Sequence, residues 1–351
     1  MEIEQQIWGA TSEGEAVVLY TLRNAAGAEV RLCNVGAAVV SILVPDRDGH
    51  LADVALGYKD FRSYFGDPAL CGKSIGRVAG CIAYGTMRID GEEYRLDING
   101  MAGHLNGGVK GFAGRLWESR VETNRVVMSL SSDDGDQGYP GNLQVEAAFD
   151  FDEDNALEIT YIARTDRTTP VNMACNLLLN LGGEGSGSVL DHELRLDAST
   201  VLEADDRLIP TGKLLGVAGT PADFRSLRRL GEGVDSDFDR IRMLRGHDHF
   251  FPVDGWRQNI LTEVGELRDA RSGRRVEILS SQPGVTLYTG NRLGGGCPET
   301  KSGGRYRDYE GVAVVCQGYP DAVNRPEFPS PLLAPDGFYC QKTVYRFGTF
   351  R

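Results

Sequence analysis

The sequence predicts an all-β protein built mostly of antiparallel strands. Apolar and polar residues alternate with period two over 143–147 and 157–162, the pattern of a strand with one buried and one solvated face. Turn-forming residues fill 152–155 between the two runs, so the pair is expected to form a hairpin. Strand-length runs recur along the whole chain, while helical periodicity is nearly absent. We therefore expect a large antiparallel β-sandwich with helix confined to short pieces such as 60–65.

The remaining elements follow the same pattern in chain order. Residues 88–96 carry Asp90-Gly91 between two short strands, which is a strong hairpin signal. The chain has 45 glycines, and their densest patch, at 294–304, separates strand runs at 287–289 and 312–315. A long loop there is typical of large sandwiches, which carry functional loops at one rim. Neither a repeat nor a polar linker divides the chain, so we expect one domain over residues 1–351.

Composition limits the class of partner. Lys and Arg number 37 against 50 Asp and Glu, a formal charge of −13, and no basic stripe suited to nucleic acid is present. No apolar run approaches about 18 residues, and the N-terminus lacks the pattern of a signal peptide. The seven cysteines form no Cys-x-x-Cys pair, which favours free thiols in a reducing compartment. We expect a cytoplasmic protein with no nucleic-acid or membrane partner.

The motifs that would imply a metal or cofactor are incomplete. Residues 235–239 resemble the start of an EF-hand loop, but Arg240 stands where the loop needs glycine. His247 and His249 lie two apart on an expected strand and could approach one metal, but no third ligand stands out. The glycines at 107–111 lack the spacing of a phosphate-binding loop. We therefore expect no metal and no cofactor.

A series of short motifs runs in order from residue 76 towards the C-terminus. Its segments are Gly76-Arg77-Val78-Ala79-Gly80-Cys81-Ile82, Gly103-His104-Leu105-Asn106-Gly107-Gly108, Asp136-Gln137-Gly138-Tyr139-Pro140-Gly141-Asn142, Thr169-Pro170-Val171-Asn172 with Asn180-Leu181, Asp248-His249-Phe250, Gln282-Pro283-Gly284-Val285, and Tyr319-Pro320-Asp321-Ala322-Val323-Asn324. The ordered set resembles the signature stretches of the aldose 1-epimerase (galactose mutarotase) family. The resemblance implies one large galactose mutarotase-like sandwich with a sugar-binding cleft on a concave sheet face.

The resemblance also implies a two-group chemistry that this sequence lacks. Mutarotation needs a base for the anomeric hydroxyl and an acid for the ring oxygen. In the family these are a Glu and a His, and registering on the neighbouring motifs places Val315 and Asn176 at those positions. Neither side chain can exchange a proton at neutral pH. Each lost group typically costs about 10²–10⁴-fold in rate, so we expect ordinary mutarotation close to the uncatalysed rate.

Other family positions have changed as well. Cys81 stands for an Arg, Asn106 for the second His of a His-x-His pair, and Thr286 for a Gln. His104 and Asp248 match their family counterparts, which position the sugar. The residues expected to contact the substrate are Asn106, Asn172, Asn176, Cys81, Thr286 and Val315.

Catalysis, if it is retained, is expected to use His104 as proton carrier and Asp248 to orient it, because imidazole titrates near neutral pH. The alternative for His104, a hydrogen-bonded support for the turn at 107–108, has equal weight. Leu177, Leu178 and Leu179 are expected to make the pocket apolar together with Val315. Cys81, Cys175 and Cys316 could meet there, as reactive thiols if a cation lowers their pKa or otherwise as packing.

Three functions remain open. The first is an enzyme repurposed as a non-mutarotase isomerase, cyclase or lyase on a small hydroxylated or partly apolar substrate. The second is a catalytically inactive sugar-binding or regulatory protein. The third is a true aldose 1-epimerase that uses His104 and Asp248. In each case the partner is a sugar or sugar-like small molecule, and we favour the first.

Overall fold

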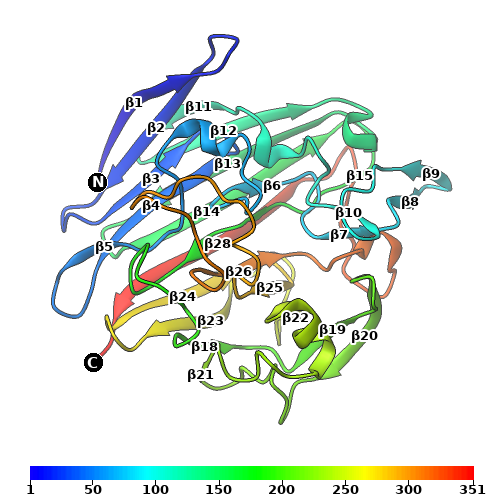
Figure 1. The fold of residues 1–351 in the computed structure, drawn as a ribbon. Helices are drawn as coiled ribbons and strands as arrows, with labels where there is room; N and C mark the ends of the chain where they lie inside the picture. Colours follow the sequence, from blue (N-terminus) through cyan, green and yellow to red (C-terminus); the bar gives the residue numbers. More distant parts are fainter.

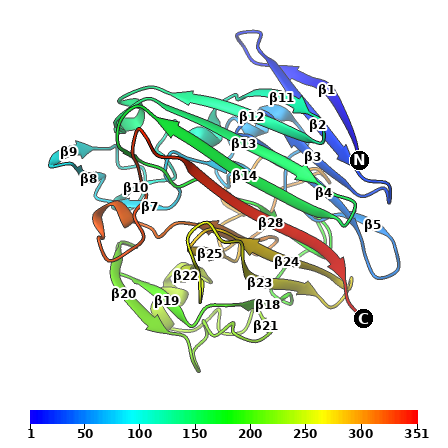
Figure 2. The same ribbon diagram turned by 180° about the vertical axis from the view of Figure 1, so that it is seen from behind.

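The computed structural model describes residues 1–351, and β-strands dominate it. Its largest sheet has nine strands and faces the viewer in Figure 2, where the molecule is seen from behind. In order across this sheet they are β11 (Glu118–Glu122), β12 (Arg125–Ser132), β13 (Leu143–Phe151), β14 (Ala156–Thr165), β28 (Tyr339–Thr349), β24 (Arg274–Ser280), β23 (Thr262–Asp269), β18 (Glu193–Leu196) and β21 (Arg228–Arg229). All neighbouring pairs are antiparallel, which confirms the predicted fold class.

The C-terminal strand β28 occupies the middle of that sheet. It pairs with β14 on one side, where Ile159 lies opposite Thr343, and with β24 on the other, where Ile278 lies opposite Tyr345. Figure 2 shows it as the long red strand between green and yellow neighbours. The last strand of the chain therefore joins the strands of the two halves of the sequence.

Two further sheets face the nine-stranded sheet. One consists of β1 (Glu2–Ala10), β2 (Ala16–Arg23), β3 (Glu29–Cys33), β4 (Ala38–Pro45) and β5 (Leu51–Asp53), and the other of β17 (Leu178–Leu179), β26 (Val312–Gln317), β25 (Gly284–Tyr288) and β22 (Asp248–Pro252). A main core of 54 buried residues draws on all three sheets. The molecule is thus a sandwich, with the four-stranded sheet in the layer opposite the nine-stranded one (Figure 1).

Small two-stranded sheets and short helices fill the connections. The sheets are β6 (Ser74–Ile75) with β16 (Ala174–Cys175), β7 (Cys81–Ala83) with β10 (Gly103–Leu105), β8 (Thr86–Ile89) with β9 (Glu92–Arg95), β15 (Thr169–Pro170) with β27 (Leu332–Leu333), and β19 (Thr200–Ala204) with β20 (Pro210–Gly216). The helices are η1 (Phe61–Tyr64), η2 (Phe112–Gly114), η3 (Asp136–Gly138), η4 (Phe238–Arg240), α1 (Ile241–Leu244) and η5 (Ala322–Asn324). None of them has the length and apolar character needed to cross a membrane.

The local predictions are confirmed. Strands β13 and β14 form the predicted hairpin, and β8 and β9 form the second one. Asp90 and Gly91 both have positive φ, 52° and 84°, as a tight two-residue hairpin turn requires. Asp60 caps η1 by accepting a hydrogen bond from the Arg62 backbone N–H. The expected long loop joins β25 to β26 over residues 289–311, and we call it the 289–311 loop.

Candidate functional site

The four-stranded sheet has an inner and an outer face. Side chains alternate along a strand, so neighbouring residues point to opposite faces. Val285, Leu287, Val312, Val314 and Cys316 point into the main core. The alternate residues of β22, β25 and β26 form the outer face, which carries Asp248, Thr286 and Val315 of the predicted site.

Strand register arranges the outer face in rows. In one row Phe250, Thr286 and Val315 lie opposite one another on three successive strands. In the next row Asp248 lies opposite Tyr288, Tyr288 opposite Ala313, and Ala313 opposite Leu178. Extending the β17–β26 register by two residues brings Asn176 towards Val315. The fold therefore brings Thr286, Val315 and Asp248 together on one surface.

The β17 and β26 part of this face is covered, and we call it the sealed half. Val315 is only 5% exposed and belongs to a second apolar cluster of 20 buried residues, with Leu178 and Ala313. Two segments supply the cover, the 56–75 segment and the 289–311 loop, through the side chains of Tyr58, Tyr64, Cys71, Ile75, Leu293, Cys297 and Tyr306. A carboxylate at position 315 would lose most of its hydration.

One part of the apolar-pocket prediction is wrong. Leu178 packs in the second cluster beside Val315, as expected, but Leu177 and Leu179 belong to the main core. Three consecutive extended residues cannot all point to one side, because side chains alternate across a strand.

On β22 and β25 the outer face is accessible except at Phe250, which is 4% exposed, and we call the accessible part the open half. It consists of Asp248, which is exposed, and the half-buried Thr286 and Tyr288. The surrounding protein disfavours the charged form and raises the pKa of the Asp248 carboxyl, while His249 and Arg292 act in the opposite direction. Burial raises the pKa of Tyr288 to about 12, which keeps its hydroxyl neutral. The open half thus offers one carboxyl and two hydroxyls.

Asn176 presents a single free acceptor. Its Nδ2 donates to the carbonyl oxygen of Ala69 at 2.8 Å and to that of Leu70 at 3.3 Å. Its Oδ1 accepts no hydrogen bond from the protein, and the residue is half-buried. Asn176 can therefore accept a hydrogen bond from a ligand hydroxyl but cannot protonate a ring oxygen.

Two other predicted contact residues are engaged by the protein backbone. Asn172 is 3% exposed; its Nδ2 donates to Ala79 O at 3.0 Å and its Oδ1 accepts from Gly318 N at 2.8 Å. Asn106 Oδ1 accepts from Gly80 N at 2.9 Å. These amides hold the segment around Gly80 in place, so a role in ligand contact stays a prediction.

The structure does not pair His104 with Asp248. On β10, His104 lies opposite Ile82 and Leu105 opposite Cys81, so the imidazole and Cys81 point to opposite sides. His104 is 1% exposed, its Nδ1 lies 2.7 Å from Asp97 O, and its ring meets the Tyr139 ring edge-on. Burial lowers its pKa. These contacts fit a supporting role for the Nδ1 side of the ring, whereas Nε2 has no hydrogen-bond partner in the protein. The proton-carrier role of His104 stays a prediction.

The three cysteines near the replaced positions do not meet in one site. Cys175 and Cys316 pack in the main core, whereas Cys81 lies in a small separate cluster with Ala83 and Ile209. Burial raises the pKa of each of the three thiols to about 12. They are therefore protonated at neutral pH, which favours packing over reactivity.

Of the two histidines beside Asp248, only His249 has a ring that is hydrogen-bonded within the protein. His249 Nδ1 accepts a hydrogen bond from Asp248 N at 3.1 Å, and its Nε2 meets the backbone carbonyl of Asp239. His247 is fully buried against the Phe224 ring, and burial lowers its pKa to about 3. Both ring nitrogens of His247 lack a hydrogen-bond partner in the protein, so its position is explained by packing alone.

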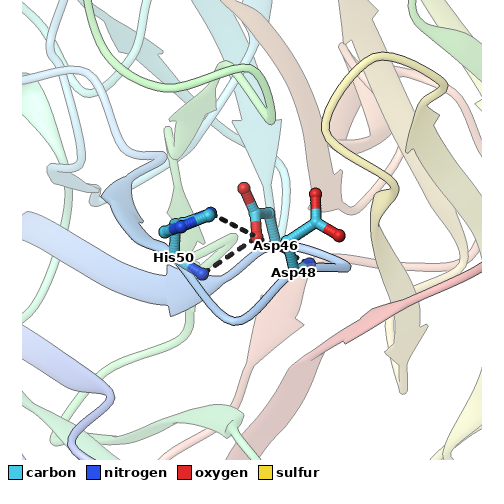
Figure 3. A group of neighbouring side chains, drawn as sticks. All are labelled: Asp46, Asp48 and His50. Atoms are coloured by element: carbon cyan, nitrogen blue, oxygen red, sulfur yellow. Dashed lines mark hydrogen bonds and ion pairs between the residues drawn. The ribbon is translucent and has the colours of Figure 1, made fainter.

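A second group of potential ligands lies at the turn between β4 and β5. Figure 3 shows Asp46, Asp48 and His50 side by side there. Asp46 Oδ1 accepts hydrogen bonds from the backbone N–H groups of Asp48 and His50, both at 2.9 Å. This is the geometry of an aspartate that stabilises its own turn.

Sequence analysis missed a positively charged hollow of about 830 Å³ next to the open half. We call it the arginine hollow, and it is lined by Arg245, Arg292, Arg305, Tyr306, Arg307, Asp308 and two glycines. Its arginines are spread over more than 60 positions of an acidic chain, so no local charge run marks them. The only local signal in the sequence is the pair Arg305 and Arg307, which flank Tyr306.

Comparisons with known proteins identify the sequence family. Residues 18–346 match the family model described as aldose 1-epimerase. The chain is 39% identical to galactose mutarotase of Homo sapiens over 312 residues, 89% of each chain. It is 36% identical to aldose 1-epimerase of Escherichia coli strain K12 over 342 residues, 95% of this chain and 96% of that protein.

Solved structures give the same answer for the fold. An aldose epimerase homologue from C. elegans superposes with a TM-score of 0.86 at 28% identity and covers 94% of this chain and 98% of its own. Galactose 1-epimerase from Lactobacillus acidophilus superposes with a TM-score of 0.85 at 25% identity, covering 100% and 99%. The galactose mutarotase-like fold is confirmed, and the chain belongs to the aldose 1-epimerase family.

Proposed function

We propose that this protein is an isomerase-type member of its family that acts on a small hydroxylated molecule without a His–Glu pair. Its acid–base group is Asp248. The observation that carries the proposal is the contrast on the outer face: Val315 is sealed among apolar side chains, while Asp248, one row away, is accessible and has a raised pKa.

The open half offers a single carboxyl, and the other polar groups near it are neutral hydrogen-bonding groups. A carboxyl with a raised pKa is a stronger base, and it can take a proton from a bound substrate and return it. The hydroxyls of Thr286 and Tyr288 can hold substrate hydroxyls, and Asn176 Oδ1 can accept a further hydrogen bond.

Polarimetry tests whether the protein lacks mutarotase activity, as the proposal expects. Freshly dissolved α-D-galactose and α-D-glucose are followed with and without the protein, with the Escherichia coli relative as positive control. We expect anomer interconversion at the rate of buffer alone. A faster rate that disappears in His104→Ala would establish a mutarotase that depends on that imidazole and would contradict the proposal.

Proton NMR in D₂O tests whether the protein turns over a small hydroxylated compound. The protein is incubated with aldoses, ketoses, uronates and sugar phosphates, and deuterium incorporation or product formation is recorded. We expect turnover of a hydroxylated compound that is lost in Asp248→Asn and kept in Asp336→Asn, which removes an exposed carboxyl elsewhere. Tight binding with no turnover across the panel would instead identify a sugar-binding protein.

Aldose 1-epimerase activity itself is the second candidate. The observation in its favour is the 39% identity to proteins named galactose mutarotase. Under this candidate the polarimetric rate exceeds the buffer rate and depends on Asp248, because no other carboxyl stands on the outer face rows. The same polarimetric experiment therefore decides between the two.

A further inference from the structure

We propose that the arginine hollow binds the anionic group, a phosphate ester or a carboxylate, of the small hydroxylated molecule that the open half receives. The inference deepens the proposed function and rests on it for the hydroxylated part of the ligand. The anion site itself stands on the hollow and its guanidinium groups.

The positive charge of the hollow is largely unbalanced. Arg245 pairs with Asp308 at 3.0 Å, and Asp308 is the only carboxylate in the lining. The side chains of Arg292, Arg305 and Arg307 are exposed and form no ion pair or hydrogen bond. Three free guanidinium groups around one concavity repel one another, and a bound anion relieves that repulsion.

The backbone of the hollow is held in place by the protein. Arg292 N donates to Tyr288 Oη at 3.1 Å, and Gly294 N donates to Asp308 Oδ1 at 2.9 Å. Arg307 N donates to Glu310 Oε2 at 3.0 Å. Because these contacts fix the positions of the Cα atoms, the arginines converge without an ordering cost for the loop.

The alternation around Tyr306 directs two of the arginines outward. Tyr306 is 3% exposed, and its hydroxyl donates to Gly57 O at 2.7 Å and accepts from Gly57 N at 2.8 Å. Arg305 and Arg307 flank this anchor and therefore point to solvent on the side of the hollow. Guanidinium groups form paired hydrogen bonds with phosphate and carboxylate oxygens, which suits such an arrangement.

Tyr288 connects the hollow to the open half. Its Cα lies opposite that of Asp248 on the neighbouring strand, and its hydroxyl accepts from Arg292 N in the wall of the hollow. The positive charge of Arg292 also acts on the Asp248 carboxyl and partly offsets the rise in its pKa that burial causes. One molecule can thus place its hydroxyls at Asp248 and Tyr288 and its anionic group among the arginines.

Isothermal titration calorimetry on the full chain tests the inference. The ligands are glucose 6-phosphate, glucuronate, inorganic phosphate and galactose, each at low and at high salt. We expect glucose 6-phosphate or glucuronate to bind more tightly than galactose and to weaken as salt rises. Whichever of the two binds more tightly identifies the anionic group.

Two variants and a matched control make the test specific. Arg305→Gln with Arg307→Gln, and separately Arg292→Gln, should weaken the anionic ligand about tenfold or more, because a hydrogen bond to a charged group is lost. Arg257→Gln with Arg271→Gln removes the same charge from exposed arginines that have no side-chain partner, and should change nothing. Thermal unfolding confirms that every variant is folded.

The possible failures can be told apart. Equal affinity for galactose and the anionic sugars, no binding of any anion, or equal loss in the control pair would overturn the arginine hollow as an anion site. Binding of inorganic phosphate that the hollow variants abolish, with no gain from the sugar part, would keep the anion site and overturn the proposed function.

Discussion

The two halves of the outer face share one sheet but have different environments. On β26 and β17 the side chains of Val315, Ala313 and Leu178 are sealed under the 56–75 segment and the 289–311 loop. On β22 and β25 the side chains of Asp248 and Tyr288 remain accessible. The same backbone therefore carries an apolar, water-free surface and a polar, charged one within two strands. The comparison teaches that loops from elsewhere in the chain, and not the strands, decide where chemistry is possible.

The largest expected effect comes from placing a carboxyl in the sealed half. Val315→Glu should destabilise the fold by about 3–5 kcal/mol, because the carboxylate is buried without a partner. Thr286→Glu, in the same row on the open half, should cost about 1 kcal/mol. Guanidinium unfolding at pH 7 measures both. Equal costs would mean that the two halves do not differ in solvent access.

The same burial should prevent restoration of the catalytic pair expected from the family. Asn176→His combined with Val315→Glu restores the two side chains expected from the family, but the new carboxyl lies under the apolar cover. Burial should raise its pKa, so the variant should recover stability as pH falls. We expect little mutarotase activity by polarimetry. Substantial activity in a stable double variant would show that the cover moves aside.

Buried imidazoles and the open carboxyl should respond to pH in opposite directions. His192 is 3% exposed, and burial lowers its pKa from 6.5 to about 4, so the unfolded chain binds its proton first as pH falls. Stability is then lost between pH 6.5 and about 4, by about 3 kcal/mol at roughly 1.4 kcal/mol per pKa unit. His104, whose pKa is also lowered, adds a loss of the same sign.

Asp248 contributes the opposite sign. Its pKa is raised above 3.8 in the folded state, so its penalty at neutral pH disappears as pH falls from that raised value to 3.8. Urea titrations at several pH values should show a steeper acid loss in Asp248→Asn and a shallower one in His192→Gln. Parallel curves for both variants would contradict these environments.

Asp248→Asn should also weaken ligand binding. Loss of a charged hydrogen-bond acceptor costs about 1.5–3 kcal/mol, or about ten- to a hundredfold in Kd. Calorimetry with the ligand found by the NMR panel measures the change, and Asp336→Asn is the control. Retained affinity in a folded Asp248→Asn protein would place the ligand elsewhere on the molecule.

The smallest expected effect concerns the boundary between the open half and the arginine hollow. Tyr288→Phe removes the hydroxyl that accepts from Arg292 N, which should cost about 1 kcal/mol of stability. It should weaken glucose 6-phosphate more than it weakens galactose, since the wall of the hollow loosens. An equal loss of affinity for both ligands would mean that Tyr288 contacts only the sugar part of the ligand and does not support the arginine hollow.

The predictable parts of this protein are those that depend on neighbours in sequence. The two hairpins, the helical turn capped by Asp60 and the 289–311 loop follow from turn chemistry and period-two patterns. The family motifs singled out Thr286, Val315 and Asp248, and the strand register puts these three residues on one face of the sheet. These features need no knowledge of how distant segments pack.

The rest depends on contacts between distant segments. The side to which His104 points is set by its pairing with Ile82, more than 20 residues away. The cover over Val315 comes from residues 56–75 and 293–306, whose apolar character alone does not reveal what they pack against. The arginine hollow likewise forms only when Arg245 meets the 289–311 loop. Neither hydrophobic periodicity nor a short motif predicts such contacts between distant segments.

The position of β28 has a consequence for biosynthesis. Its 11 residues lie between β14 and β24 but follow both in the sequence, so the nine-stranded sheet stays divided until residues 339–349 have been translated. Until then the facing edges of β14 and β24 are unpaired and able to aggregate. A nascent chain held on the ribosome should therefore remain protease-sensitive until Phe347 has left the exit tunnel, and deletion of the final strand should yield insoluble protein.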